Sequence, residues 1–421
     1  MKKKTKILHI IQYFGCGGVQ DIFFSTINGL QNSGMTENVG CVLFDRLNIK
    51  KYFSPKKKTA IVKVPYSSYN LSLAMINQQK FNCMLSNPSS QSDSSISNNI
   101  TMVTPNLPYR YSYLFMTLIK PYEFLTLLQI VKEENPDIVY ASHSLGQLPI
   151  ASIIGKLLRK KVVVCYYGED KSFPFFHKVG TRIAYFLADN IITIFYRGAD
   201  ELKNIGVSPE KIVHIPNSRN TLKYSSLISK KQAKIKLGLK GNEFVIGLIS
   251  RLDPIKNHEA VIRVLPELLK IRKNLKFVIV GGSPSDFYKK KLQKLVKELN
   301  LEKNVLFLGH REEIADILAA FDIFAHPSFS EGQPGAVLEA MCAGLPIVAS
   351  DVGGTKELLG DTGILISPTD QKGLTEAIVK LMNDPKLRKE YGKKAQQRAE
   401  IEFSEEKMIN NYEKLFLHLN K

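Results

Sequence analysis

The sequence predicts an α/β protein made of two Rossmann-like domains with parallel sheets. The chain has 421 residues, which is enough for two domains of ordinary size. Its first residues follow the order strand, glycine-rich turn, helix, strand, which is the order of a βαβ unit. Short apolar runs bounded by turn residues then recur as far as Ile366, as expected of buried strands that alternate with helices. Two amphipathic helices are expected to follow Ile366 and close the chain.

The glycine-rich turn near the N-terminus is the first candidate ligand contact. It follows the predicted strand Thr5–Ile11 and ends in Gly17 and Gly18. A dinucleotide site is one interpretation, because Asp45 stands where an acidic residue could hold a ribose. The glycines are spaced G-x-G-G rather than G-x-G-x-x-G, however, so the motif is a weak signal for such a site.

The remainder of the first half is predicted to complete a parallel sheet that includes the strand Lys161–Tyr166. The predicted strand Asp137–Ala141 is followed by His143, and ligands of open α/β sheets gather beyond such strand ends. A lone histidine is more often structural than functional, so both roles stay open. Residues 86–99 are mostly Ser and Asn, which predicts a mobile loop. Residues 108–113 are either a loop on the domain edge or an acceptor-binding lip, and 216–220 is interpreted as an interdomain hinge.

Two cations follow the first predicted strand of the second half. Arg251 and Lys256 come directly after Phe244–Ile249 and before an amphipathic helix. The planar fork of arginine and the point charge of lysine can together neutralise a diphosphate. A solvated basic turn is the alternative interpretation.

The most informative stretch runs from Ser330 to Gly354 and has the sequence SEGQPGAVLEAMCAGLPIVASDVGG. Glu331 enters a predicted loop, and Glu339 lies eight positions later in a predicted helix that ends at Gly344. The amides at the helix start, those of Gly335, Ala336 and Val337, carry a partial positive charge that suits a phosphate. An ordinary loop–helix–strand unit with two solvated glutamates is the competing interpretation, which the glycines of the loop disfavour.

This stretch resembles the signature of nucleotide-sugar-dependent glycosyltransferases of family four. The matching pattern is Glu-Gly-x-Pro/Gly, seven residues between the two glutamates, then Ala-Met-x-Ala-Gly-x-Pro-Ile-Val. The resemblance is strong from Asn242 to Gly363 and looser over the N-terminal half. It implies a retaining enzyme of GT-B architecture, with two Rossmann-like domains facing each other across a cleft. The implied domains are 1–216, which binds the acceptor, and 217–421, which binds the nucleotide sugar, with a last helix (about 403–419) returning to the first domain.

The resemblance also implies roles for individual residues. The family's Arg-x-x-x-x-Lys pair binds the donor diphosphate, which implies that role for Arg251 and Lys256. Glu331 is implied to bind donor-sugar hydroxyls and Glu339 the ribose, and Glu331 and His143 are the two candidate catalytic residues. The other implied donor contacts are Gly17, Gly18, Gly335, Ala336 and Val337 at the diphosphate, and His310 and Arg311 near the base.

The charge of the chain predicts anionic partners. The formal net charge is +19, and up to Ile215 there are 25 Lys and Arg against 14 Asp and Glu. No nucleic-acid-binding module is recognisable, so we expect a peripheral contact with an anionic membrane surface, with surface solubility as the alternative. The longest apolar stretches, such as 182–196, are interrupted by Asp189-Asn190, so no spanning helix is expected. Five scattered cysteines without CxxC spacing predict reduced thiols and a cytoplasmic location.

Together these observations predict a glycosyltransferase that moves a sugar from a nucleotide sugar to a saccharide or lipid-linked saccharide. No cofactor is expected, and no metal, because no two aspartates stand two apart in the Asp-x-Asp pattern of metal-dependent transferases. Two alternatives remain: a non-catalytic partner subunit with the same fold, and a nucleotide-sugar epimerase of the same architecture.

Overall fold

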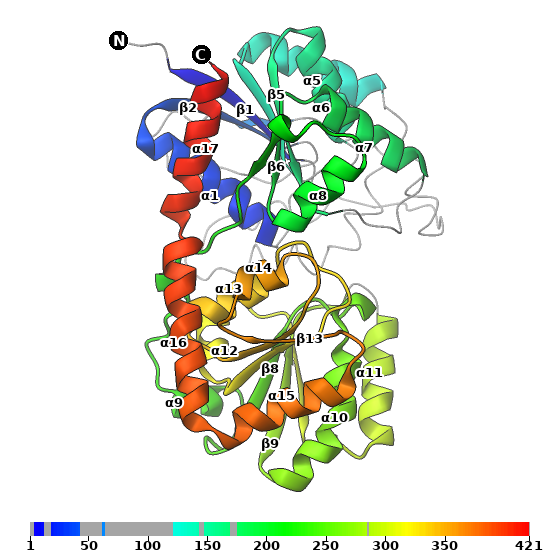
Figure 1. The fold of residues 1–421 in the computed structure, drawn as a ribbon, viewed down its shortest axis with the longest axis vertical. Helices are drawn as coiled ribbons and strands as arrows, with labels where there is room; N and C mark the ends of the chain where they lie inside the picture. The colour runs from blue at the N-terminus through cyan, green and yellow to red at the C-terminus, as the bar shows by residue number, and fades with distance from the viewer. Residues whose placement is uncertain are drawn as a thin grey trace, which may run out of the picture. The chain divides into compact units, whose positions relative to one another are not determined.

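The computed structural model describes residues 4–11, 18–42, 61–63, 121–142, 147–168, 175–283 and 286–420. The chain divides into two compact units (Figure 1). Unit 1 consists of Met1–Ile192, Leu202–Val213 and Ile409–Lys421, and unit 2 of Thr193–Glu201 and His214–Met408. This division differs from the predicted domains 1–216 and 217–421, since 193–201 belongs with the second unit. Phe195 explains the difference, because its buried side chain packs against Gly354 of unit 2.

Unit 1 is built on a seven-stranded sheet with the strand order β3-β2-β1-β4-β5-β6-β7. Strand β1 pairs in parallel with β2 on one side and with the central strand β4 on the other. All residues of β4, and all but the first of β5, are buried, as expected of strands covered by helices on both faces. The strands are β1 (Thr5–Ile11), β2 (Thr36–Val42), β3 (Ile61–Lys63), β4 (Ile138–Ser142), β5 (Lys161–Tyr166), β6 (Asn190–Thr193) and β7 (Ile212–His214). The helices between them are α1 (Gly18–Ser33), α5 (Pro121–Glu134), α6 (Gln147–Leu157), α7 (Phe175–Leu187) and α8 (Tyr196–Asn204).

The last helix, α17 (Glu405–Leu419), packs its C-terminal part on the sheet of unit 1. The hydroxyl of Tyr412 lies 3.1 Å from that of Tyr140 on β4. The ring of Phe416 contacts the rings of Tyr140 and of His9 on β1, at centroid distances of 5.6 and 6.1 Å. The two tyrosine hydroxyls are thus buried as hydrogen-bond partners of each other, as buried polar groups require.

Unit 2 is built on a six-stranded sheet with the order β10-β9-β8-β11-β12-β13, and each of its five strand pairs is parallel. The strands are β8 (Phe244–Ile249), β9 (Leu275–Val280), β10 (Val305–Gly309), β11 (Ile323–His326), β12 (Ile347–Ser350) and β13 (Ile364–Ile366). The helices are α9 (Lys230–Lys236), α10 (His258–Ile271), α11 (Asp286–Glu298), α12 (Ile314–Ala319), α13 (Gly335–Cys342), α14 (Thr355–Leu359), α15 (Gln371–Asn383) and α16 (Pro385–Glu402).

The alternation of side chains along β8 builds a core on each face of this sheet. Phe244, Ile246 and Leu248 pack in a cluster with residues of α10, α11 and α15. Val245 and Ile249 belong to a second cluster with residues of α12, α13 and α16. Successive strand residues point to opposite faces, so one strand serves both cores.

Both sheets have the strand order 3-2-1-4-5-6 of the doubly wound fold, with β7 added at the edge of unit 1. In such a sheet the strand order reverses between the first and fourth strands, and ligands bind outside the carboxyl ends of the strands at that point. In unit 2 this switch point lies between β8 and β11. The prediction of two Rossmann-like sheets is therefore confirmed, and it directs attention to the loops after β8 and β11.

Two details differ from the sequence prediction. Three helices follow β13 rather than two, because Asp384 ends α15 and its carboxylate accepts a hydrogen bond from Leu387 N (2.9 Å) at the start of α16, where Pro385 fits the first helical position. The short helix α14 was not predicted. Among the helices of the described residues, none is both long and apolar enough to cross a membrane.

Candidate functional site

Two loops converge at the switch point of unit 2. The first follows β8 and contains Arg251 and Lys256, and the second follows β11 and contains Glu331. Phe329 N in the second loop donates a hydrogen bond of 2.8 Å to Ile255 O in the first. The loops after the neighbouring strands β8 and β11 thus place the predicted cations and the predicted carboxylate at the same edge of the sheet.

Glu331 is the centre of a buried charged cluster. Its Oε1 accepts a hydrogen bond of 2.7 Å from Lys256 Nζ and lies 2.7 Å from Nε2 of His326. The side chains of Glu331, Lys256 and His326 are 9 %, 17 % and 3 % exposed. Burial alone would raise the pKa of the Glu331 carboxyl, but the charges of His326 and Lys256 and their hydrogen bonds hold that pKa well below its usual range. Glu331 is therefore a carboxylate at neutral pH.

His326 was missed by the sequence analysis. It ends β11, and Ser328 Oγ lies 3.1 Å from the same Nε2 that contacts Glu331. Its Nδ1 is buried without a hydrogen-bond partner among the described residues. The available signal was its position at the end of an apolar run, which is the signal that singled out His143 in the first half.

A second buried histidine supports the loop after β8. His258, the first residue of α10, has its Nε2 3.0 Å from Ser250 Oγ. Burial, together with the nearby charges of His326 and Lys256, lowers its pKa to about 3. His258 is therefore neutral, and it fixes the start of the loop that carries Lys256.

Two glycines hold the loop of Glu331 in place. Gly354 N donates a hydrogen bond of 2.6 Å to Gly332 O, and a Cβ on Gly354 would lie 2.7 Å from the Cβ of Phe195. Gly353 has φ +54°, a conformation that side chains disfavour. Larger residues at either position would displace the backbone beside Glu331.

The two predicted diphosphate-binding cations lie in different environments. Lys256 is paired with Glu331, whereas the Arg251 side chain is 63 % exposed and its Nη2 lies 3.8 Å from Asp253 Oδ2. Arg251 is thus the cation of this loop that can reorient without breaking a buried contact.

The helix α13 begins where the sequence predicted it, at Gly335. Pro334 precedes it and its side chain makes no capping hydrogen bond, so no side chain of the cap competes for the amides at the helix start. Ala336 follows in the first turn, and Val337 N bonds back to Pro334 O at 3.1 Å. This end of α13 has the features of an anion-binding helix terminus.

Glu339 does not point freely toward solvent, because its Oε1 accepts a hydrogen bond of 3.1 Å from Arg219 Nε. Arg219 was assigned only to an interdomain hinge, and no pattern in the sequence indicated its role. It is 6 % exposed, and its Nη1 donates to Ser218 O at 3.0 Å. The structure thus adds a buried cation beside the second glutamate.

The loops after β9 and β10 extend the same edge of the sheet. Gly281 N donates to Gly309 O at 2.7 Å, and Leu252 N donates to Gly282 O at 2.9 Å. His310 directly follows this strand end and is exposed. The neighbouring Arg311 pairs with Glu313 at 2.7 Å. The predicted base-binding residues are therefore connected by backbone hydrogen bonds to the loop of Arg251.

Several predicted site residues belong to unit 1. Gly18 is the first residue of α1. Gly17, His143, Asp45 and the loop 86–99 lie outside the described residues. Within the described ranges, no three His, Cys, Asp or Glu side chains gather as a metal site would require.

Two family models match the chain. Residues 229–398 match "Glycosyl transferases group 1" and residues 87–221 match "Glycosyltransferase Family 4". Among curated proteins, the N-acetyl-alpha-D-glucosaminyl L-malate synthase of Bacillus anthracis is 25 % identical over 298 residues, which is 69 % of this chain and 77 % of that protein. The UDP-Gal:alpha-D-GlcNAc-diphosphoundecaprenol alpha-1,3-galactosyltransferase of Escherichia coli is 36 % identical over 192 residues, or 44 % of this chain and 49 % of that enzyme, so the chain matches about half the length of this relative.

Solved structures give the same fold. Anabaena Alr3699/HepE in complex with UDP superposes with a TM-score of 0.75 at 20 % identity, covering 98 % of this chain and all of that one. WaaG, a glycosyltransferase involved in lipopolysaccharide biosynthesis, has a TM-score of 0.67 at 16 % identity, with 97 % and 99 % covered. At these identities the likeness shows the fold, which is the predicted GT-B fold.

Proposed function

This chain belongs to the group 1, family-four glycosyltransferases, and from that premise we propose that it transfers a sugar from a nucleoside-diphosphate sugar to a saccharide or lipid-linked saccharide. The observation that carries this proposal is the buried Glu331–Lys256–His326 cluster beside the uncapped start of α13. A glycosyltransferase must bind an anionic diphosphate next to a sugar, and this cluster offers cations, helix amides and a carboxylate together.

The proposed reaction breaks the bond between the anomeric carbon and the diphosphate oxygen and forms a bond to an acceptor hydroxyl. The nucleoside diphosphate leaves with its electron pair, and the hydroxyl proton passes to the leaving phosphate or to solvent. Negative charge grows on the leaving group, so Arg251, Lys256 and the amides of Gly335–Val337 are proposed to stabilise it. Proposed donor contacts also include the backbone of Gly17 and Gly18.

Glu331 is proposed to face the donor sugar as that sugar gains positive character. Its low pKa keeps the carboxylate charged, and its contact with Lys256 fixes it beside the diphosphate-binding loop. Glu339, farther along α13, is proposed to bind the ribose. His310 and Arg311 are proposed to lie at the base, and His143 near the acceptor hydroxyl.

We propose retention of the anomeric configuration without a metal ion. A same-face transfer assisted by the leaving phosphate needs no protein nucleophile. The chain offers Arg251 and Lys256 for the charge neutralisation that a metal supplies in other transferases.

The nucleotide is proposed to be a uridine diphosphate. Alr3699/HepE is described in complex with UDP and with UDP-glucose, and the Escherichia coli relative is named for a UDP-Gal donor and a diphosphoundecaprenol-linked acceptor. A lipid-linked acceptor requires access to a membrane surface, which we propose occurs on the cytoplasmic side.

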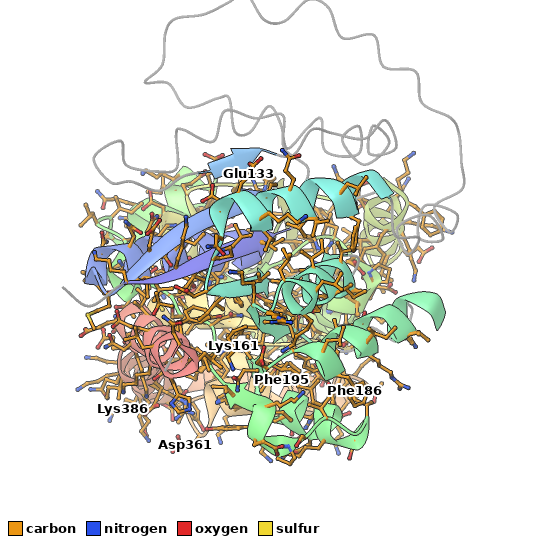
Figure 2. The ribbon with its side chains drawn as sticks, turned by 90° about the horizontal axis from the view of Figure 1, so that it is seen from above. Glu133, Lys161, Phe186, Phe195, Asp361 and Lys386 are labelled. Atoms are coloured by element: carbon orange, nitrogen blue, oxygen red, sulfur yellow. The ribbon has the colours of Figure 1, made fainter. Side chains whose placement is uncertain are left out.

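The helix α7 is proposed to contact an anionic membrane. Its buried face includes Ala184 and Tyr185, while Val179, Ile183 and Phe186 are 39 %, 44 % and 51 % exposed. Phe186 is labelled on this helix in Figure 2. The helix sequence FFHKVGTRIAYFL contains two cations and no acidic residue. An exposed apolar stripe with cations is the composition of an interfacial helix.

The experiment that tests the function combines the full chain with UDP-glucose, UDP-galactose and their N-acetyl forms, with and without undecaprenyl-diphosphate-linked sugars. Release of UDP that depends on the acceptor, with a product of α configuration by NMR, is the expected result. Binding of UDP without transfer to any acceptor would favour a non-catalytic partner subunit. Interconversion of the donor sugars without an acceptor would favour an epimerase.

A further inference from the structure

We infer that Arg219 is a positioning residue that fixes Glu339 and the first turn of α13 for donor binding. This inference rests on the proposed function, because it assigns the task of Arg219 within the proposed donor site. Its evidence is the set of contacts made by one buried guanidinium.

The Arg219 side chain is held at three points. Nε donates to Glu339 Oε1 at 3.1 Å, and Nη1 donates to Ser218 O at 3.0 Å. Nη2 lies against the start of α13, since a Cβ on Gly335 would be 2.7 Å from it. The backbone of Arg219 is fixed as well, because its N donates to Phe403 O at 3.1 Å.

These contacts leave the guanidinium little freedom. The residue is only 6 % exposed, so removing it would leave the Glu339 carboxylate without its buried counter-charge. Glu339 itself is 16 % exposed, which leaves part of its carboxylate accessible to a ligand. Arg219 thus holds Oε1 of Glu339, while the partial exposure of the Glu339 side chain allows a ligand to reach it.

The position of Arg219 is electrostatically unusual. A cation beside the N-terminus of a helix is disfavoured, because that end already carries a partial positive charge. Here it is kept in place by Glu339 and by the carbonyl of Ser218. The surplus positive potential at the start of α13 is reduced when an anion binds there, so the arrangement favours a phosphorylated ligand.

Gly335 is explained by the same arrangement. The atoms within 4 Å of a Cβ built on this residue are Arg219 Nη2 and Arg219 Cζ. Gly335 does not have a positive φ, so its backbone conformation is open to alanine. A methyl group at this position would therefore displace the Arg219 guanidinium, although the backbone conformation itself accepts one.

The test compares Arg219→Met, Arg219→Lys and Glu339→Gln in the full chain. Methionine fills much of the buried space without the fork or the charge, so the donor KM should rise about tenfold or more while kcat changes less than threefold. Lysine keeps the charge but cannot make the three contacts of the guanidinium, so the donor KM of Arg219→Lys should lie between those of the wild type and Arg219→Met. The double variant Arg219→Met, Glu339→Gln should have a donor KM no higher than that of the more impaired single variant. Each substitution removes the same Arg219–Glu339 ion pair, so their effects should not add.

A second pair of variants keeps the inference falsifiable if Arg219→Met is unstable. Gly335→Ala should raise the donor KM several-fold in the wild-type background and have little further effect in Arg219→Lys, which keeps the charge but lacks the obstructing Nη2. UDP binding by calorimetry should follow the same pattern without requiring an acceptor.

Three outcomes overturn the inference while the wild type transfers sugar normally. One is an unchanged donor KM in Arg219→Met, and another is a fall in kcat alone together with a lower unfolding temperature, which marks a purely structural role. The third is an equal cost of Gly335→Ala in both backgrounds. A wild type that neither binds a nucleotide nor transfers sugar would instead refute the proposed function.

Discussion

The two units have the same strand order but place different chemistry at corresponding strands. In unit 2, the fourth strand β11 ends in His326, which joins a buried cluster of charges. In unit 1, the fourth strand β4 carries Tyr140 and ends in Ser142, whose hydroxyls bond to Tyr412 and Tyr167 at 3.1 Å each. The shared topology supplies a position for a ligand in each unit, and the different side chains there lead us to propose the diphosphate site in unit 2.

The largest expected effect is the loss of the Glu331 charge from the buried cluster that distinguishes unit 2 from unit 1. Glu331→Gln keeps the shape of the side chain but removes the charge that we propose faces the donor sugar. We expect kcat to fall roughly 100-fold, as for the loss of a group that acts in the transition state, with a small change in donor KM. Steady-state and single-turnover rates check this, and a change in KM alone would contradict the assigned role.

The second prediction compares the buried histidines of the units. Burial lowers the pKa of His9 in unit 1 to about 4 and is the main cause of the pKa of about 3 for His258 in unit 2. As pH falls below about 6.5, the unfolded chain binds protons that the folded units exclude, so both units lose stability until their folded pKa values are reached. For His9 this amounts to about 3 kcal/mol between pH 6.5 and 4.

Hydrogen exchange measured at pH 7 and 5 tests this unit by unit. His9→Gln should weaken the pH dependence of protection in β1 and β2 while leaving β8 and β9 unchanged. The exposed His418→Gln is the matched control. Equal pH dependence in wild type and His9→Gln would show that His9 is not the origin of acid lability.

The third prediction distinguishes Arg251 from Lys256, the two proposed diphosphate-binding cations of unit 2. Lys256→Ala removes the partner of a buried carboxylate, whereas Arg251→Ala removes an exposed cation. Each should reduce transfer by about 1.5–3 kcal/mol of transition-state free energy through the lost diphosphate contact. Only Lys256→Ala should also lower the unfolding temperature, because Glu331 stays buried. Near-normal turnover in both variants would end the assignment of the diphosphate site.

The smallest expected effect concerns unit 1. Replacing Ile183 and Phe186 on α7 with serine should reduce binding to anionic vesicles roughly tenfold, because apolar surface is lost from the interface. The control is the pair Ile271→Ser and Ile401→Ser, which are similarly exposed residues of unit 2. Equal binding by both double variants, or equal binding of the wild type to neutral and anionic vesicles at low salt, would refute this surface.

The sequence was most informative where apolar runs of strand length are bounded by turn residues. Strands such as Lys161–Tyr166 and Phe244–Ile249 agree with the structure at both ends, because continuous apolar runs bounded by turns leave little choice. The closing helices were miscounted because Asp384-Pro385, an N-cap and first-turn proline, was not recognised as the start of a new helix.

The candidate site was only half visible in the sequence. Glu331 and Lys256 could be predicted from a motif, but they are 75 residues apart and their contact depends on the pairing of β8 with β11. Arg219 lies 120 residues from Glu339, with no local pattern that marks it as buried. Long-range partners of this kind follow from the tertiary fold rather than from spacing.

The most direct test of the central claim is the thermal unfolding of the full chain with a panel of nucleotide sugars. A ligand at 100 times its dissociation constant stabilises the folded protein by about 2.7 kcal/mol. We predict that at least one uridine-diphosphate sugar raises the unfolding temperature of the wild type and has little effect on the Arg251→Ala, Lys256→Ala double variant. Equal stabilisation of both proteins, or no stabilisation by any nucleotide sugar, would contradict the placement of the donor site at the switch point of unit 2.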